Sequence, residues 1–228
     1  MSEKSLESIQ ESGFRLTEAQ SERLQPLLDY IAISINTKMA ALEAEGKTVK
    51  VYGPEWCYDN PDRAGQMHAD VIVGAYGSTY ALPNKNPDAN AAALRANSLD
   101  MYLMEVDGEV TGTTCLVDMG NGIAELGRSA SQGRTGNSII QDLRIFDWLT
   151  NEATAQKYHT LFTTLRTAPD REIPVDDGQT FTMRGGQAVT EHWKKFPGLT
   201  VNGFAPLYLK QGKLEQFSHA TLTRSEYD

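Results

Sequence analysis

One stretch near the middle of the chain constrains the fold more than any other. Two apolar runs, Met101–Val106 and Val110–Val117, flank Asp107-Gly108, a dipeptide typical of tight hairpin turns. A second turn over residues 118–122 leads into a third run, Ile123–Arg128. Because each run has the length and composition of a strand, this order predicts an antiparallel meander.

A polar loop and a helix follow the third strand. The loop spans residues 129–137 and contains Gly133 and Gly136. The apolar residues after it fall on one face of a helix: Ile139, Ile140, Leu143, Phe146 and Leu149. The first turn of a helix leaves backbone N–H groups free, and these groups attract anions such as a diphosphate. Glycine lets the backbone approach such an anion closely, and Arg134 would add a charge contact. An ordinary strand-to-helix connection would use the same residues, so the loop alone leaves both interpretations open.

The remaining segments extend this pattern into a mixed α/β chain. An apolar stripe from Leu24 to Leu42, ended by Gly46, predicts an N-terminal helix over residues 17–46. Further helices are expected over 89–96 and 186–196, and strands over 48–52, 160–167, 204–209 and 214–222. Residues 53–63 and 168–184 are expected to form loops. The segment 64–76 stays open, because its β-branched residues favour a strand while the residues before them tolerate a helix.

Charge and composition exclude several classes of protein. The 228 residues include 21 lysines and arginines and 30 aspartates and glutamates, a formal net charge of -9. A nucleic-acid binder needs a basic surface, so that class is disfavoured. No apolar run approaches the roughly 20 residues of a membrane span, and the polar first residues lack the order of a secretory signal. We therefore expect a cytoplasmic protein.

The metal-ligating residues form no recognisable site. Cys57 and Cys115 are the only cysteines, so a four-thiolate metal site and a disulfide framework are both excluded. The loop residues Asp170, Asp176 and Asp177 lack the spacing of an EF-hand. They could instead attract a cationic substrate, although charged loops are commonly just solvated. We expect no bound metal.

The order of these motifs resembles the GNAT family of acyl-CoA N-acyltransferases. The resemblance rests on Glu105–Gly112, on Gly122–Arg128 and on the glycine loop, and it continues through Leu165–Ala168 and the passage 192–209. It covers residues 48–222 and implies an α/β fold with a mixed, mainly antiparallel central sheet flanked by helices. It also makes 64–76 a helix. We therefore divide the chain into an N-terminal helical extension, residues 1–46, and a GNAT-like domain, residues 47–228.

The resemblance also implies a site for the co-substrate, acetyl-CoA or another acyl-CoA. Its binding residues would be Ser129, Ala130, Ser131, Gly133, Arg134, Thr135, Gly136, Asn137 and Ser138. The loop departs from the family pattern Gln/Arg-x-x-Gly-x-Gly/Ala. With Gly136 as the first motif glycine, Gly133 takes the Gln/Arg place and Ser138 the last small-residue place.

In the family, an amine attacks the thioester carbonyl of acyl-CoA. Glu125 occupies a strand position where relatives carry a general base, and Tyr208 is the candidate acid for the departing thiolate. Glu125 is alternatively a solvated residue or an ion-pair partner of Arg128, and Tyr208 a core tyrosine. His159 and His192 are further candidate bases. Direct transfer needs no nucleophilic cysteine, which leaves Cys115 as a small buried hydrophobe.

The expected function is therefore transfer of an acyl group, most simply acetyl, to an amine of a small molecule or a protein. Two alternatives stay open. One is a catalytically weak GNAT-like module that senses acyl-CoA, which the altered loop favours. The other is acyl-homoserine-lactone-type synthesis on the same fold. The apolar stripe of the N-terminal helix must be covered by its own domain or by a second copy, so a homodimer is possible.

Overall fold

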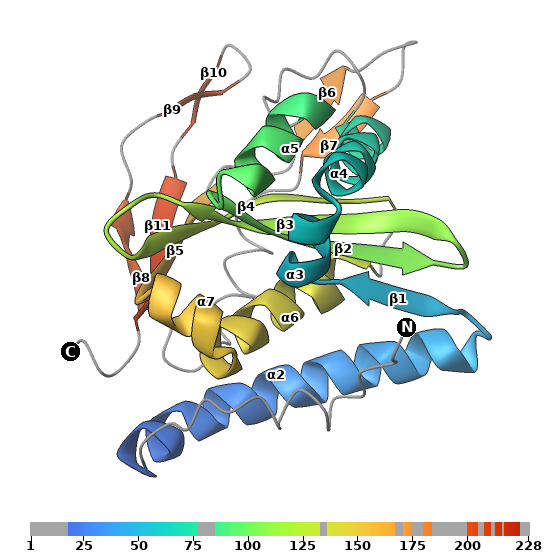
Figure 1. The fold of residues 1–228 in the computed structure, drawn as a ribbon. Coiled ribbons are helices and arrows are strands. Elements are labelled where there is room, and N and C mark those ends of the chain that lie inside the picture. Colours follow the sequence, from blue (N-terminus) through green and yellow to red (C-terminus); the bar gives the residue numbers. More distant parts are fainter. Residues whose placement is uncertain are drawn as a thin grey trace.

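A seven-stranded sheet in the order β1-β2-β3-β4-β5-β11-β8 forms the centre of the molecule (Figure 1). The computed structural model describes residues 18–76, 85–132, 136–166, 171–174, 180–183, 200–204, 208–210, 213–215 and 217–223. The strands of this sheet are β1 (Val49–Tyr52), β2 (Leu99–Val106), β3 (Glu109–Asp118), β4 (Ile123–Ser131), β5 (Thr160–Arg166), β8 (Thr200–Phe204) and β11 (Phe217–Thr223). All neighbouring strands run antiparallel except β4 and β5, which are parallel. The expected mixed, mainly antiparallel sheet is confirmed.

Helices cover both faces of the sheet (Figure 1). One face carries α3 (Pro54–Asp59), α4 (Pro61–Tyr76) and α5 (Pro87–Arg95). The other carries α6 (Gly136–Thr150) and α7 (Glu152–Lys157), and α2 (Glu18–Ala44) packs on α6 from outside. Within the described residues, no helix has the length and apolar character needed to cross a membrane.

The predicted meander is confirmed in β2, β3 and β4. Asp107 and Gly108 form the first turn with φ values of 52° and 88°, the left-handed backbone that a two-residue hairpin requires. Leu103 pairs with Thr113 across this hairpin. One prediction needs correction: the third strand does not end at Arg128, since β4 continues to Ser131.

The N-terminal helix is confirmed, and its apolar stripe faces its own domain. Leu27, Ile31 and Ile35 are buried in one core cluster with residues of α6. Asp142 of α6 is buried at this contact, where it accepts hydrogen bonds from Ser34 Oγ at 2.7 Å and Lys38 Nζ at 2.6 Å. The helix is thus covered within one chain, and the division at residue 46 and the homodimer stay predictions.

Two predicted loops contain regular structure instead. Residues 53–63 form α3 and the start of α4, each of which begins with a proline, Pro54 and Pro61. Proline is tolerated there because the first helical N–H groups have no partner within the helix. The predicted loop 168–184 contains a hairpin of β6 (Arg171–Pro174) and β7 (Thr180–Met183). The segment 64–76 is helical, as the family resemblance implied.

The C-terminal strands differ in detail from the prediction. Residues 204–209 were expected to form one strand, but they include the end of β8 and the start of β9 (Tyr208–Lys210). Strand β9 pairs with β10 (Lys213–Glu215) in a separate two-stranded sheet, and β11 alone returns to the central sheet. The predicted helix 186–196 lies outside the described residues.

Candidate functional site

Strands β4 and β5 lie side by side only where they begin. Ile123–Glu125 pairs with Thr160–Phe162 in parallel register. One residue further on, Thr163 Oγ1 donates a hydrogen bond of 3.2 Å to the carbonyl oxygen of Leu126. Beyond this point β4 and β5 both continue, but within the described residues no ladder joins them. Within the described residues, the edge of β4 that faces β5 therefore has no strand partner past Leu126. We call this separation of the two strands the β4/β5 opening.

A bulge bends β4 at the same point. Cys115 of β3 pairs with Gly127, whereas Thr113 pairs with Ala130, so two residues of β4 face one residue of β3. One of these two is Arg128, whose φ is 49°. A bulge rotates the strand after it, and here it reorients the residues that border the β4/β5 opening.

Arg144 of α6 holds this bulge from the buried side. Its guanidinium donates to Thr114 Oγ1, to the carbonyl of Cys115 at 2.8 Å and to the carbonyl of Gly127 at 3.4 Å. Burial lowers the pKa of Arg144 to about 10, so the side chain remains charged at neutral pH. The helix that follows the glycine loop is thus bonded directly to the bent part of β4.

Glu125 lies at the point where the strands separate. It is half-buried and pairs with Val117 on one side and Phe162 on the other. Its neighbour Leu126 belongs to the core on the α6 face, so the alternation of the strand places Glu125 on the face of α3, α4 and α5. Among the described residues no ion pair joins Glu125 to Arg128, which removes one alternative for Glu125.

The predicted acyl-CoA residues divide into three groups. Ser129 belongs to the bulge of β4, Ala130 and Ser131 follow it, and all three border the β4/β5 opening. The backbone of Gly136, Asn137 and Ser138 forms the first turn of α6. Gly133, Arg134 and Thr135 lie outside the described residues. The two described groups lie on consecutive elements, so one ligand could contact both.

The other candidate catalytic residues lie on elements other than β4 or outside the described residues. Tyr208 begins β9, which pairs with β10 rather than with a strand of the central sheet. His159 contacts Thr160 Oγ1 at 2.9 Å and the carbonyl of Asn121 at 3.0 Å, where β5 begins. Burial raises the pKa of Cys115 to about 12, which keeps its thiol protonated. His192 and the three loop aspartates, Asp170, Asp176 and Asp177, lie outside the described residues.

His68 was not singled out in the sequence. This α4 residue is fully buried, and its Nδ1 lies 2.6 Å from Thr113 Oγ1 while its Nε2 has no partner. Burial, aided by the positive charge of Arg128, lowers its pKa to about 3, so the ring is neutral. Its place on the helical stripe with Ala64, Val71 and Ile72 is a signal that could have identified it, once 64–76 is accepted as a helix.

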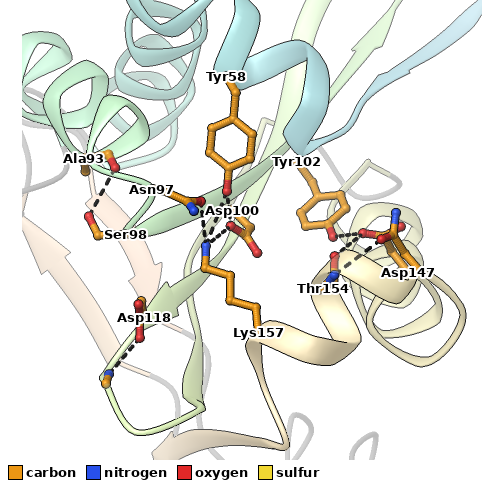
Figure 2. Close-up of polar contacts among 12 residues, drawn as sticks. Tyr58, Ala93, Asn97, Ser98, Asp100, Tyr102, Asp118, Asp147, Thr154 and Lys157 are labelled. Carbon is orange, nitrogen blue, oxygen red and sulfur yellow. Dashed lines mark hydrogen bonds and ion pairs between the residues drawn. The ribbon is translucent and has the colours of Figure 1, made fainter.

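A different polar cluster occupies the end of the sheet where β4 and β5 begin (Figure 2). Asp100 of β2 accepts hydrogen bonds from Tyr58 Oη and, at 2.7 Å, from Lys157 Nζ. Tyr102 donates to Asp147 at 2.5 Å. These contacts join α3, β2, α6 and α7, and their charged groups face protein partners. No group of three or more His, Cys, Asp or Glu residues suited to a metal ion occurs in the described part of the chain.

Comparison with solved structures identifies the fold. No protein-family model and no curated protein matches the chain. The aminoglycoside 6'-N-acetyltransferase of Enterococcus faecium superposes with a TM-score of 0.50 at 11% identity, over 77% of this chain and 96% of that one. A GNAT-family acetyltransferase of Streptococcus pneumoniae gives 0.49 at 10% identity, over 78% and 98%. One of Elizabethkingia anophelis, with acetyl-CoA bound, gives 0.41 at 10%, over 77% and 97%. The chain has the fold of the GNAT acetyltransferases.

Proposed function

We propose that this protein transfers an acyl group, most simply acetyl, from acyl-CoA to an amine. The observation that carries this proposal is the β4/β5 opening beside Glu125. There the parallel pairing of β4 with β5 stops after Glu125, although both strands continue, inside a sheet whose other strands pair with their neighbours. This is an arrangement that can hold a thioester carbonyl by hydrogen bonds and present it to a base on the neighbouring residue.

We assign the acyl-CoA to β4 and the start of α6. The backbone N–H groups of residues 129–131 would hold the thioester carbonyl, and the first turn of α6 would hold the diphosphate through its free N–H groups. The proposed diphosphate-binding set is Gly133, Arg134, Thr135, Gly136, Asn137 and Ser138. The bonds from Arg144 support this assignment, because they fix α6 relative to the bulge of β4.

The reaction needs one proton acceptor and one proton donor. Glu125 would take a proton from the ammonium group of the acceptor, which frees the nitrogen lone pair. The nitrogen then attacks the thioester carbon, the C–N bond forms, and the C–S bond breaks as the tetrahedral intermediate collapses. The coenzyme thiolate leaves and takes up a proton, for which Tyr208 is the proposed donor, and the nitrogen releases its second proton, which replaces the one that Tyr208 gives up. The products are an amide and free coenzyme A.

The test is a direct assay on the purified protein. Acetyl-CoA is mixed with a broad panel of small amines and amino-terminal peptides, free thiol is followed with a chromogenic reagent, and products are identified by mass. We expect thiol release that depends on the amine, together with a product heavier by one acetyl group. Binding of acetyl-CoA without acylation of any amine would favour the alternative of a sensing module. Absence of binding would contradict the proposal.

A further inference from the structure

The backbone of Arg128 adopts a conformation that arginine disfavours. Four non-glycine residues among those described have positive φ: Asn97, Asp107, Asn121 and Arg128. Asparagine and aspartate tolerate the left-handed region, because their short polar side chains bond locally. For other L-residues it costs about 1–2 kcal/mol. Such strain persists where the surrounding structure imposes it, and it concentrates at functional sites. The presence of arginine at residue 128, rather than glycine or asparagine, therefore needs an explanation.

Within the part of the chain that the structure describes, the charge of Arg128 also has no acidic partner. The other basic side chains that the structure describes each have a partner. Lys38, Lys47, Lys50, Arg95 and Lys157 pair with carboxylates, Arg63 lies over the Trp56 ring, Arg144 binds backbone oxygens, and Lys85 makes a contact of its own. Among the described residues Arg128 contacts one acceptor, the Oδ1 atom of Asn90, at 3.4 Å. This is a weak contact for a half-buried guanidinium with five N–H donors.

The neighbours of Arg128 are neutral. His68, whose pKa is lowered by burial and by Arg128 itself, carries no charge at neutral pH. Asn90 is a neutral amide whose Nδ2 donates to the carbonyl of Gly65 at 3.5 Å. A cation in neutral surroundings with unused donors is suited to binding an anion from outside the chain.

Arg128 shares a face of β4 with Glu125. Its contact with Asn90 of α5 places its side chain on the α3–α5 side, where Glu125 also lies. The two lie three positions apart along the strand, a span of at most about 10 Å at 3.4 Å per residue. They form no ion pair with each other, so a negative and a positive side chain border the opening without neutralising one another.

We propose that Arg128 binds an anionic group of the acceptor, so that the acceptor is an amine that also carries a carboxylate or a phosphate. This inference rests on the proposed acyl transfer and names its substrate class. Glu125 would attract the ammonium group while Arg128 holds the anionic group, and together they would orient one molecule across the face of β4. The planar guanidinium fork matches the two oxygens of a carboxylate or phosphate.

The experiment compares matched acceptors. Each L-amino acid is assayed beside its amide, and ethanolamine is assayed beside phosphoethanolamine. Only the anionic group differs within a pair. The amino group of an amide is the less basic of the two and thus more often unprotonated, so its intrinsic reactivity cannot produce a preference for the acid. We expect the anionic member of at least one pair to be preferred by roughly 10- to 100-fold in kcat/KM, as for one charge-assisted interaction.

Three variants attribute the preference to Arg128. Arg128→Asn removes the charge and places a residue that tolerates positive φ, so it should fold, and the preference should fall to within about threefold of unity. Arg128→Lys should restore part of it. Arg95→Gln removes a positive charge at the end of α5 that is paired with Asp62 at 2.5 Å, and it should keep the preference.

Two results would overturn the inference. The first is a wild-type protein that binds acetyl-CoA and acylates neutral amines as well as their anionic counterparts, which would leave the acyl transfer itself intact. The second is a preference that survives in Arg128→Asn. A protein that neither binds acetyl-CoA by calorimetry nor acylates any amine would overturn the acyl-transfer proposal, and this inference with it.

Discussion

The charged side chains at the two ends of the β4–β5 pair differ in whether they have partners. At the end where the strands begin, Asp100 is bonded to Lys157 and Tyr58, and Asp147 to Tyr102 (Figure 2). At the end where the strands separate, Glu125 and Arg128 face the same side and form no ion pair within the described residues. We call these the closed end and the open end.

The difference distinguishes charged residues that stabilise the fold from charged residues that we propose bind a ligand. A buried charge without a partner is costly, so a chain that pairs its charges at the closed end would be expected to pair them at the open end too. Residues whose unpaired charge lowers stability persist where a ligand uses them. The closed end therefore fixes the geometry of the strands, and the open end is where we propose that the chemistry takes place.

The largest expected effect is on catalysis at the open end. Glu125→Gln keeps the shape of the side chain and removes its basicity, so the acylation rate should fall by ~10²–10⁴. Acetyl-CoA affinity should stay close to normal, because a base acts on the transition state. Glu109→Gln, on an exposed residue of β3, is the matched control and should leave the rate unchanged. Steady-state kinetics measure both variants, and near-normal turnover in Glu125→Gln would remove this residue from the mechanism.

At the closed end, the corresponding change should act on stability. Lys157→Met leaves Asp100, whose side chain is 4% exposed, without its cation. We expect the free energy of unfolding to fall by about 2–4 kcal/mol, below the full cost of a buried pair because the Lys157 side chain is 21% exposed. Urea unfolding measures this. Replacing Asp100 by Asn in the same variant should recover part of the loss, and Lys47→Met, at an exposed pair, should cost far less. Equal effects of Lys157→Met and Lys47→Met would contradict the distinction.

Arg144 should affect both stability and ligand binding, because it is a buried residue whose hydrogen bonds hold the bulge at the open end. Arg144→Lys keeps the charge, but an ammonium group cannot reach Thr114, Cys115 and Gly127 together. Leaving a buried acceptor unsatisfied costs about 1–3 kcal/mol, which urea unfolding would detect. Because the bulge loosens, acetyl-CoA affinity should weaken as well. A variant that loses stability but binds acetyl-CoA normally would show that the bulge does not position the cofactor.

The last expected effect concerns pH and is absent at neutral pH. The pKa of His68 is about 3 in the folded chain against an ordinary value of 6.5, so the unfolded chain binds a proton more readily between these values. Stability from His68 is therefore fully present above pH 6.5 and is lost as the pH falls toward 3, with a slope of up to about 1.4 kcal/mol per pH unit. His68→Gln should flatten this part of the stability profile, which urea unfolding at a series of pH values measures. An unchanged slope in His68→Gln would show that this ring is accessible to protons in the fold.

Local patterns were sufficient for much of this fold. The hairpin at Asp107-Gly108 needs a left-handed turn, and its two residues supply that turn directly, so β2 and β3 could be predicted from composition. Helix α2 followed from the spacing of its apolar stripe. Helix α4 could not be predicted locally, because Val71, Ile72 and Val73 prefer strands. Tertiary packing on β3 and β4 overrides that preference.

The site was harder to predict than the fold. The position of Glu125 and of the glycine loop followed from the family resemblance, but the β4/β5 opening depends on which strands pair, and strand pairing is not a local property. The bulge was missed because the sequence pattern favoured a loop after Arg128. Consequently Arg128 was considered only as a partner for Glu125, and Arg144 was not singled out within the apolar stripe of α6.

The most direct test of the central claim is a calorimetric titration of acetyl-CoA into three proteins. Gly136→Asp places a carboxylate at the start of α6, where it is compatible with the helix but would face the phosphates. Gly120→Asp makes the same change in a closed-end turn that has open space around it, at a left-handed φ of 80° that aspartate tolerates better than most residues. We predict that the wild type and Gly120→Asp bind acetyl-CoA equally well and that Gly136→Asp does not bind it. Binding by Gly136→Asp at wild-type affinity, or no binding by the wild type, would contradict the claim that the open end is the acyl-CoA site.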